Sequence, residues 1–293
     1  MVKAYILETP QTPALPIIFD SPHSGTHYPQ DFDYACALST LKTAEDHYVE
    51  ELFSNAPAYG AHFLHALFPR SYIDVNRIID DIDPALLAES WSGPLPINPS
   101  ARSDAGIGLI RRLVKPGVPV YNRALSTEEI LHRIEHYYIP YHEALEKLIE
   151  QAHYNFGQAW HINCHSMPAA SAYPRTPSAL SLSIPRAADF VIGNLDGTSA
   201  CLSFTRALRN YIQSLGYYVT INDPFKGVEI LERHADPARG IHSIQLEINK
   251  ALYMDEKTGE KNAGYEKLKT NIDLIMGFVA TYASQNLTDL AAD

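Results

Sequence analysis

Apolar runs of strand length alternate along the chain with longer segments of helical periodicity. The strand-like runs cover residues 15–20, 61–67, 71–76, 159–163, 189–192, 217–221 and 243–249. Helical spacing covers residues 43–55, 126–157, 198–215 and 262–284. This alternation predicts an α/β fold, in which a mixed, mainly parallel sheet is covered on both faces to give three α/β/α layers and the site lies at the carboxyl ends of strands.

Local signals place the ends of two of these helices. Ser126 and Glu129 have the spacing of a capping box, and Pro140 is expected to kink the helix that follows. Thr43 and Asp46 have the same spacing, which predicts that Thr43 begins the helix over residues 43–55.

No repeat or linker-like tract divides the 293 residues, so a single domain over residues 1–293 is expected. A content of 46% hydrophobic and 19% charged residues is typical of a globular protein. No apolar run approaches the roughly 18 residues that a membrane span requires. The chain also starts without the pattern of a secretory signal, so a cytoplasmic protein is expected.

The charge balance excludes several classes of partner. Lys and Arg number 23 against 34 Asp and Glu, which gives a net charge of −11 and disfavours nucleic acid and anionic membranes. The three cysteines, Cys36, Cys164 and Cys201, match no CxxC spacing, so neither a disulfide framework nor a thiolate zinc site is indicated. A small molecule is the expected partner, and the sequence does not reveal the oligomeric state.

Candidate metal ligands follow or flank the predicted elements. His23 lies just after the run 15–20, His165 just after the run 159–163, and Glu45 and Asp46 form an acidic pair. A catalytic zinc commonly takes three ligands from His, Asp and Glu. The spacing is not diagnostic, because no His-Glu-x-x-His motif occurs. The alternative is that Asp46 caps a helix and both histidines bond neighbouring backbone.

Glu247 is a carboxylate in a predicted strand. Alternation over residues 243–249 places Ile244, Leu246 and Ile248 on one face and Glu247 on the other. In a sheet covered on both faces, a buried carboxylate is costly unless it is paired or lies at an open end. Glu247 is therefore a candidate catalytic base, and an edge strand with a solvated polar face is the alternative.

Arg70, Asn76 and Arg77 flank the predicted strand 71–76. Guanidinium groups at strand ends suit bidentate binding of a carboxylate. The alternative is structural pairing with Asp74 or with the nearby acidic residues Asp80, Asp81 and Asp83. These last three lack the spacing of a calcium loop and are interpreted as a solvated loop.

Other enzyme classes find little support. No G-x-S-x-G, G-x-G-x-x-G or P-loop motif occurs, which argues against serine hydrolase, dinucleotide and nucleotide sites. A cysteine hydrolase would use Cys164 beside His165. Adjacent residues of a strand point to opposite faces, so the two would not easily form a pair.

Six blocks together resemble the N-formylglutamate amidohydrolase family. In chain order they are Ser-Pro-His-Ser-Gly (21–25) with Tyr28-Pro29, Glu45-Asp46-His47-Tyr48-Val49, Arg70 with Asp74-Val75-Asn76-Arg77, Asn163-Cys164-His165-Ser166-Met167-Pro168, Gly193-Asn194-Leu195-Asp196-Gly197, and Gln245-Leu246-Glu247-Ile248-Asn249. The blocks follow the family's order and extend from residue 16 to about 256. The order of all six makes the resemblance specific.

The resemblance implies a zinc-exopeptidase-like fold, related to zinc carboxypeptidases and aspartoacylase, with one Zn²⁺ per chain. It assigns the zinc ligands to His23, His165 and an acidic residue. Asp46 is favoured over Glu45 because the family pattern keeps an Asp there, although the carboxypeptidase-type His-x-x-Glu is absent. Site roles follow for the remaining candidates: Glu247 as general base, and Arg70, Asn76, Arg77 and Arg111 as contacts to the substrate and its oxyanion.

The implied reaction is hydrolysis of N-formyl-L-glutamate to formate and L-glutamate, a late step of histidine degradation. Zinc would polarise the formyl oxygen and activate water, and Glu247 would move the proton. Two alternatives stay open: hydrolysis of another N-acyl amino acid, and a non-catalytic binder of acidic small molecules on the same fold.

Overall fold

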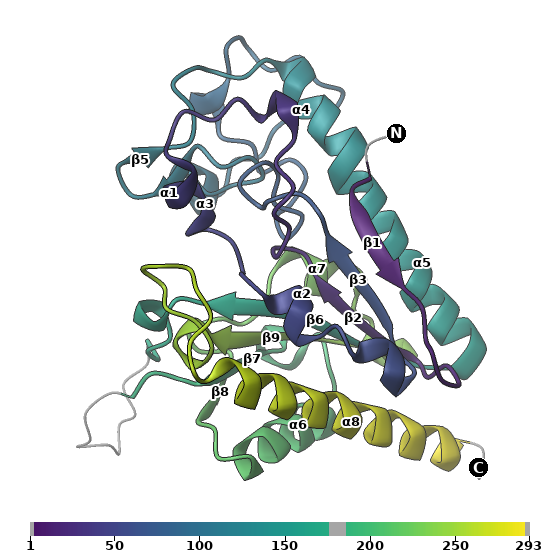
Figure 1. Ribbon diagram of the computed structural model, residues 1–293. Helices are drawn as coiled ribbons and strands as arrows, with labels where there is room; N and C mark the ends of the chain where they lie inside the picture. Colours follow the sequence, from purple (N-terminus) through teal and green to yellow (C-terminus); the bar gives the residue numbers. More distant parts are fainter. Residues whose placement is uncertain (1–2, 176–185, 291–293) are drawn as a thin grey trace. The chain divides into compact units, whose positions relative to one another are not determined.

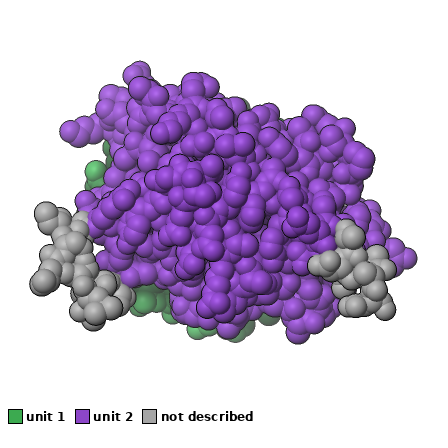
Figure 2. All heavy atoms as spheres, turned by 90° about the horizontal axis from the view of Figure 1, so that it is seen from below, with its two compact units in different colours: residues 1–6, 22–46, 65–145 green, residues 7–21, 47–64, 146–293 purple. Residues whose placement is uncertain are grey.

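The computed structural model describes residues 3–175 and 186–290 (Figure 1). The chain divides into two compact units built from interleaved segments, distinguished by colour in Figure 2. Unit 1 comprises Met1–Ile6, Pro22–Asp46 and His65–Leu145, and unit 2 comprises Leu7–Ser21, His47–Leu64 and Glu146–Asp293. The expectation of a single domain stays a prediction.

A seven-stranded sheet has the strand order β1-β3-β2-β6-β9-β7-β8. In chain order, the strands are β1 (Tyr5–Glu8), β2 (Ile17–Ser21), β3 (His62–Ala66), β6 (Ala159–Met167), β7 (Phe190–Gly193), β8 (Val219–Ile221) and β9 (Ile241–Asn249). The pairs β2–β6, β6–β9 and β7–β8 are parallel, and β7–β9 is antiparallel. The predicted α/β class with a mixed, mainly parallel sheet is confirmed.

The two faces of the central strands differ in polarity. On one face, Cys164 of β6 and Ile244 and Leu246 of β9 join the main hydrophobic core of unit 2. Helices α2 (Val49–Leu52), α6 (Leu202–Ser214) and α8 (Tyr265–Leu290) contribute to the same core. Burial of apolar surface, worth roughly 25 cal/mol per Å², stabilises this face. The opposite face carries polar side chains, which makes it available for chemistry.

Unit 1 contains long stretches without regular structure. Its described helices and strands are α1 (Leu38–Lys42), α3 (Ala101–Asp104), β4 (Leu113–Lys115), β5 (Val118–Pro119) and α4 (Thr127–Arg133). A π turn (Ile134–Tyr138) joins α4 to α5 (Ile139–Phe156), which continues into unit 2. The capping box of Ser126 and Glu129 is present, as predicted.

Short helical turns complete the described chain. The 3-10 turns are η1 (Gln30–Phe32), η2 (Ala56–Tyr59), η3 (Pro84–Leu86), η5 (Ala169–Ser171), η6 (Leu195–Gly197), η7 (Pro237–Arg239) and η8 (Lys250–Leu252). A further α-helix, α7 (Glu229–His234), precedes β9. Within residues 3–175 and 186–290, none of the helices is long and apolar enough to cross a membrane.

Several predicted elements differ from the structure. Thr43 ends α1 instead of beginning a helix, and α2 starts only at Val49, after Tyr48 adopts a left-handed backbone conformation with φ 65°. Residues 71–76 form turns and not a strand. Strand β6 continues through His165 to Met167, so that histidine lies inside the strand. The sequence did not predict β1 or α7.

Candidate metal and substrate site

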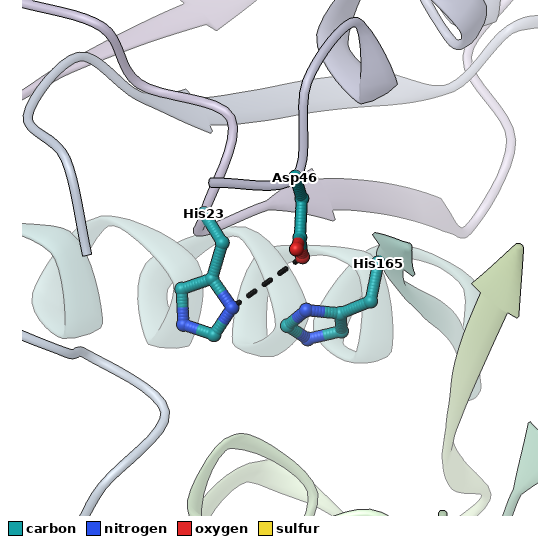
Figure 3. Close-up of side chains that lie close together, drawn as sticks. All are labelled: His23, Asp46 and His165. Atoms are coloured by element: carbon teal, nitrogen blue, oxygen red, sulfur yellow. Dashed lines mark ion pairs between the residues drawn. The ribbon is translucent and has the colours of Figure 1, made fainter. Parts of the chain in front are cut away.

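Among the described residues, one group of three side chains could hold a metal ion: His23, Asp46 and His165 (Figure 3). Each offers one ligand atom, and these atoms lie within 4.8 Å of one another. All three side chains are buried. The structure therefore brings together the three residues that the sequence singled out as metal ligands.

The ring of His23 is oriented by two carboxylates of unit 1. Its Nε2 lies 2.7 Å from Oδ1 of Asp74, and its Nδ1 lies 3.6 Å from Oδ2 of Asp46. If Nε2–H donates to Asp74, the Nδ1 lone pair of a neutral ring faces the Asp46 carboxylate. A carboxylate behind a histidine is the usual outer partner of a metal-binding imidazole. The donor set and its orientation fit a shared cation.

Asp46 lies in a segment without regular structure, which makes hydrogen bonds to residues distant in the sequence. The backbone N–H of Asp46 donates to the carbonyl of His23 at 3.0 Å, which ties the two ligand segments together. Tyr28 donates its hydroxyl to Oε1 of the neighbouring Glu45. Glu45 therefore has a different partner, and Asp46 is the acidic residue that groups with the histidines.

His165 is oriented by a buried polar network in unit 2. Its Nε2 lies 2.6 Å from Oδ1 of Asn163, whose Nδ2 donates to Asp20 at 2.7 Å. Because the bond to Asp20 fixes the amide orientation, Nε2 of His165 carries the hydrogen and Nδ1 holds the lone pair. His161 also lies 2.8 Å from Asp20 and 2.7 Å from Ser243 Oγ, which extends the network.

Glu247 is the register partner of His165. The two residues oppose each other in the parallel pair β6–β9, so their side chains share the polar face. Glu247 is 7% exposed and accepts a hydrogen bond of 2.9 Å from Gln245 Nε2. Since β9 lies between β6 and β7, the interpretation of this segment as a solvated edge strand is wrong.

Three arginines of unit 1 gather around Asp74. Arg70 donates to Asp74 Oδ2 from Nη2 at 2.8 Å, while Nη2 of Arg111 and of Arg77 lie 3.9 and 4.0 Å from that oxygen. Burial alone would raise the pKa of Asp74, but Arg70, His23 and Arg77 hold that pKa well below its usual range. Asn76 donates its backbone N–H to Asp74 Oδ1 at 3.0 Å. The structural pairing of Arg70 with Asp74, predicted from the sequence as the alternative to substrate binding, is present.

The arginine cluster carries more positive than negative charge. Burial, together with the neighbouring charge of Arg70, lowers the pKa of Arg77 to about 10 and that of Arg111 to about 9. Both guanidinium groups stay protonated at neutral pH. Within the described residues, the buried Nε of Arg111 has no hydrogen-bond partner. Such a cluster favours an anionic ligand that can accept from planar guanidinium groups.

Other sequence candidates have structural roles. Asp81 accepts from the backbone and hydroxyl of Ser100, and Asp83 pairs with Arg112 at 2.6 Å. Both carboxylates are buried, so their interpretation as a solvated loop is wrong. Cys164 lies in the apolar core, where burial raises the pKa of its thiol well above the usual value. Its position argues against a cysteine nucleophile.

Sequence reasoning missed the groups that orient the two imidazoles. The sequence indicates Asp74 only as a partner of arginine and as part of a family block, and it indicates no orienting role for Asp20, Asn163 or His161. A signal was present: His161, Asn163 and His165 alternate along one strand. Polar alternation on a strand that is buried on both faces indicates a network of functional side chains.

Comparisons with known proteins identify the family of the chain. A family model described as N-formylglutamate amidohydrolase matches residues 15–254. N-formylglutamate deformylases of Pseudomonas putida and Pseudomonas aeruginosa are each 26% identical, over 246 and 247 residues. Each alignment covers 83% of this chain, and 83% and 84% of the respective relative.

Solved structures extend the likeness to the fold. The crystal structure of N-formylglutamate amidohydrolase from Ralstonia eutropha JMP134 is 40% identical, with a TM-score of 0.90 over 97% of this chain and 100% of that chain. A protein from Agrobacterium tumefaciens, 17% identical with a TM-score of 0.65 over 99% and 97% of the chains, shares the fold. The chain belongs to the N-formylglutamate amidohydrolase family.

Proposed function

We propose that this protein hydrolyses N-formyl-L-glutamate to formate and L-glutamate, with one zinc ion held by His23, Asp46 and His165. The observation that carries the proposal is the grouping of these three ligands in a chain of this family. Two imidazoles and one carboxylate are a common ligand set of catalytic zinc, which leaves a coordination position for reactants. The reaction belongs to the last part of histidine degradation.

The metal would supply Lewis acidity, which polarises a carbonyl oxygen and lets water act as a nucleophile near neutral pH. The protein's own part begins with its two histidines. Asp74 and Asn163 each engage Nε2 of one ring, at 2.7 and 2.6 Å, which leaves Nδ1 of both rings for the metal. Preset tautomers reduce the reorganisation that metal binding requires.

The arginine cluster supplies substrate recognition. N-formyl-L-glutamate is a dianion, whereas the protein has a net charge of −11. Arg70, Arg77 and Arg111 provide local positive charge, and a substrate carboxylate would accept from their guanidinium groups. Asn76, which is 3% exposed next to Arg77, is proposed to contact the same substrate. Arg77 also takes part in stabilising the developing oxyanion.

Glu247 moves the proton in this proposal. Its carboxylate accepts a proton from the attacking water, whose oxygen bonds to the formyl carbon. The C–N bond then breaks, and Glu247 gives the proton to the departing amine of glutamate. The register of Glu247 opposite His165 and the hydrogen bond from Gln245 support this role, because both fix the carboxylate on the polar face.

Metal content and activity test the proposal together. The purified protein is assayed on N-formyl-L-glutamate, with elemental analysis before chelation, after chelation and after zinc is added back. We expect about one zinc per chain, loss of formate release on chelation and recovery with zinc. A metal-free protein that zinc does not activate would favour a non-catalytic binder.

The acyl group is tested separately. Rates on N-formyl- and N-acetyl-L-glutamate are measured side by side with the zinc-loaded protein. We expect the formyl substrate to be preferred by at least about 10-fold in kcat/KM, the scale on which a pocket discriminates one methyl group. Equal rates would assign the protein to a broader class of acyl-amino acid hydrolases.

A further inference from the structure

The segment of residues 72–77 is buried although it forms neither helix nor strand. Tyr72 and Asp74 have no exposed surface, and Arg77 is 7% exposed. Buried backbone groups must find hydrogen-bond partners, and here no ladder of a sheet provides them. The backbone N–H of Asp74 donates to Leu109 at 2.8 Å, and the N–H of Arg77 donates to the carbonyl of Asp74 at 3.1 Å. The carbonyl groups of the segment need other donors.

Side chains of the long helical segment provide these donors. Nη1 of Arg133 donates to the carbonyl of Tyr72 at 3.1 Å. Nε2 of His142 donates to the carbonyl of Val75 at 2.8 Å, and the hydroxyl of Tyr138 donates to the carbonyl of Arg77 at 2.9 Å. We call these three donors, Arg133, Tyr138 and His142, the helix clamp. Each of them is at most 1% exposed.

The π turn Ile134–Tyr138 explains how one helical segment offers all three donors. Residues 133 and 138 are five apart, and in an α-helix of 3.6 residues per turn they would point to different sides. A π turn closes its hydrogen bond over five residues, which brings both onto one side. Residues 138 and 142 are four apart and share that side by ordinary α-helical spacing.

Ring contacts and a further hydrogen bond accompany the contact between the clamp and the segment. The guanidinium of Arg133 lies over the ring of Tyr72, 4.2 Å from its centroid, and Nη1 also donates to the hydroxyl of Tyr121 at 2.7 Å. The ring of Tyr138 lies 4.4 Å from that of His142. A cation over an aromatic ring is attracted to the face of the ring, and more strongly when both are buried away from water.

We propose that Arg133, Tyr138 and His142 are positioning residues that hold segment 72–77 in the conformation that binds the acidic substrate. They act through Asp74 and Arg77 and touch no reacting atom. This inference rests on the proposed function, because it assigns the segment to recognition of substrate carboxylates. It predicts that loss of a clamp donor weakens substrate binding more than it slows turnover.

Tyr138→Phe removes one donor and keeps the ring. We expect KM for N-formyl-L-glutamate to rise about 5- to 20-fold, whereas kcat should fall by a smaller factor, about 2- to 4-fold, because Arg77 also contributes to the oxyanion. The matched control is Tyr217→Phe, which loses a hydrogen bond of 2.7 Å that the Tyr217 hydroxyl accepts from Asn271 Nδ2, and it should leave both constants unchanged. Equal falls in kcat and kcat/KM, or an unchanged KM, would overturn the inference.

His142 allows a rescue experiment. His142→Ala removes the donor to Val75 and is expected to raise KM about 5- to 20-fold, whereas His142→Gln retains an N–H donor and should recover most of the affinity. If His142→Ala does not fold, the kinetics of Tyr138→Phe still test the positioning role of the clamp. If His142→Gln is as impaired as His142→Ala while both fold, a positioning role for His142 is wrong.

Hydrogen exchange separates this inference from the proposed function. In Tyr138→Phe, the amides of residues 74–77 should exchange at least about 5-fold faster than in the wild type, with no change in Tyr217→Phe. A wild-type protein inactive on N-formyl-L-glutamate would refute the proposed function, and the exchange rates would still report on the clamp. An active wild type with unchanged exchange and KM in Tyr138→Phe would refute the clamp alone.

Discussion

The two imidazoles of the metal group are held by different kinds of structure. His165 lies inside β6, a strand paired on both sides, and its orienting partners Asn163 and Asp20 belong to the same sheet. His23 lies in irregular chain beyond β2, and its partner Asp74 belongs to a segment without regular structure. A ladder of backbone bonds fixes the first, whereas side-chain contacts fix the second.

This difference separates two kinds of mutational effect. A substitution on the sheet should affect either metal binding or proton transfer, but not both directly. The hydrogen bonds between strands hold the backbone around the substituted residue in place. Changes in the irregular region should act on several properties at once, since one carboxylate there orients both a histidine and three arginines. The following variants test this contrast.

His165→Ala should have the largest effect. It removes a direct ligand, so zinc affinity should fall by more than the roughly 10- to 100-fold typical of an outer partner, and turnover should fall to background. Elemental analysis after dialysis and formate release measure the two effects. The control is His153→Ala in α5, which removes a hydrogen bond of 2.9 Å from Nε2 to the carbonyl of Arg239. A variant that keeps one zinc per chain would contradict the assignment.

Glu247→Gln should have the next largest effect, and the effect should be confined to turnover. Turnover should fall about 10²- to 10⁴-fold, the range for a proton-transferring residue, while zinc content and KM stay close to those of the wild type. Glu232→Gln, on an exposed position of α7, is the matched control. Near-normal turnover in Glu247→Gln would show that Glu247 is not the general base.

Asp74→Asn should have a smaller effect, but it should change both zinc affinity and KM. Zinc affinity should fall about 10- to 100-fold through His23, and KM should rise because the arginines lose their shared carboxylate. Zinc titration and steady-state kinetics measure these changes. Asp196→Asn, which breaks an exposed pair with Lys226, should change neither. An effect on KM with no effect on zinc would show that His23 does not depend on Asp74.

Chemical modification of the cysteines is expected to have the smallest effect on activity. Hydrogen bonds from His242 and Ser203 outweigh burial and lower the pKa of Cys201 to about 7, whereas burial raises the pKa of Cys36 and of Cys164. Since the thiolate is the reactive form, iodoacetamide should modify Cys201 first, and more slowly as the pH falls below 7. Peptide mass spectrometry identifies the site. Activity should persist after this modification. Inactivation that parallels modification of Cys164 would instead support a cysteine hydrolase mechanism.

The sequence predicted the sheet half of the site better than the irregular half. Alternation placed Glu247 on the polar face of a strand, and β9 has that alternation. The end of β6 was placed too early because its buried polar face, His161, Asn163 and His165, resembles the polar end of a strand. Periodicity cannot distinguish a strand end from a buried functional face.

The irregular half depends on contacts that periodicity does not encode. Residues 71–76 have the composition of a strand, but their backbone bonds go to Leu109 and to the helix clamp. Asp46 has the spacing of a capping residue, yet its N–H bonds the carbonyl of His23, far away in sequence. Motif order identified these residues as important, and only the fold indicated their partners.

The most direct test of the metal site is a crystal structure of the zinc-loaded protein with anomalous data at the zinc edge. The proposal predicts one strong peak per chain at about 2.0–2.2 Å from a nitrogen of His23, a nitrogen of His165 and a carboxylate oxygen of Asp46. A peak held by other residues, or none with zinc in excess, would contradict it.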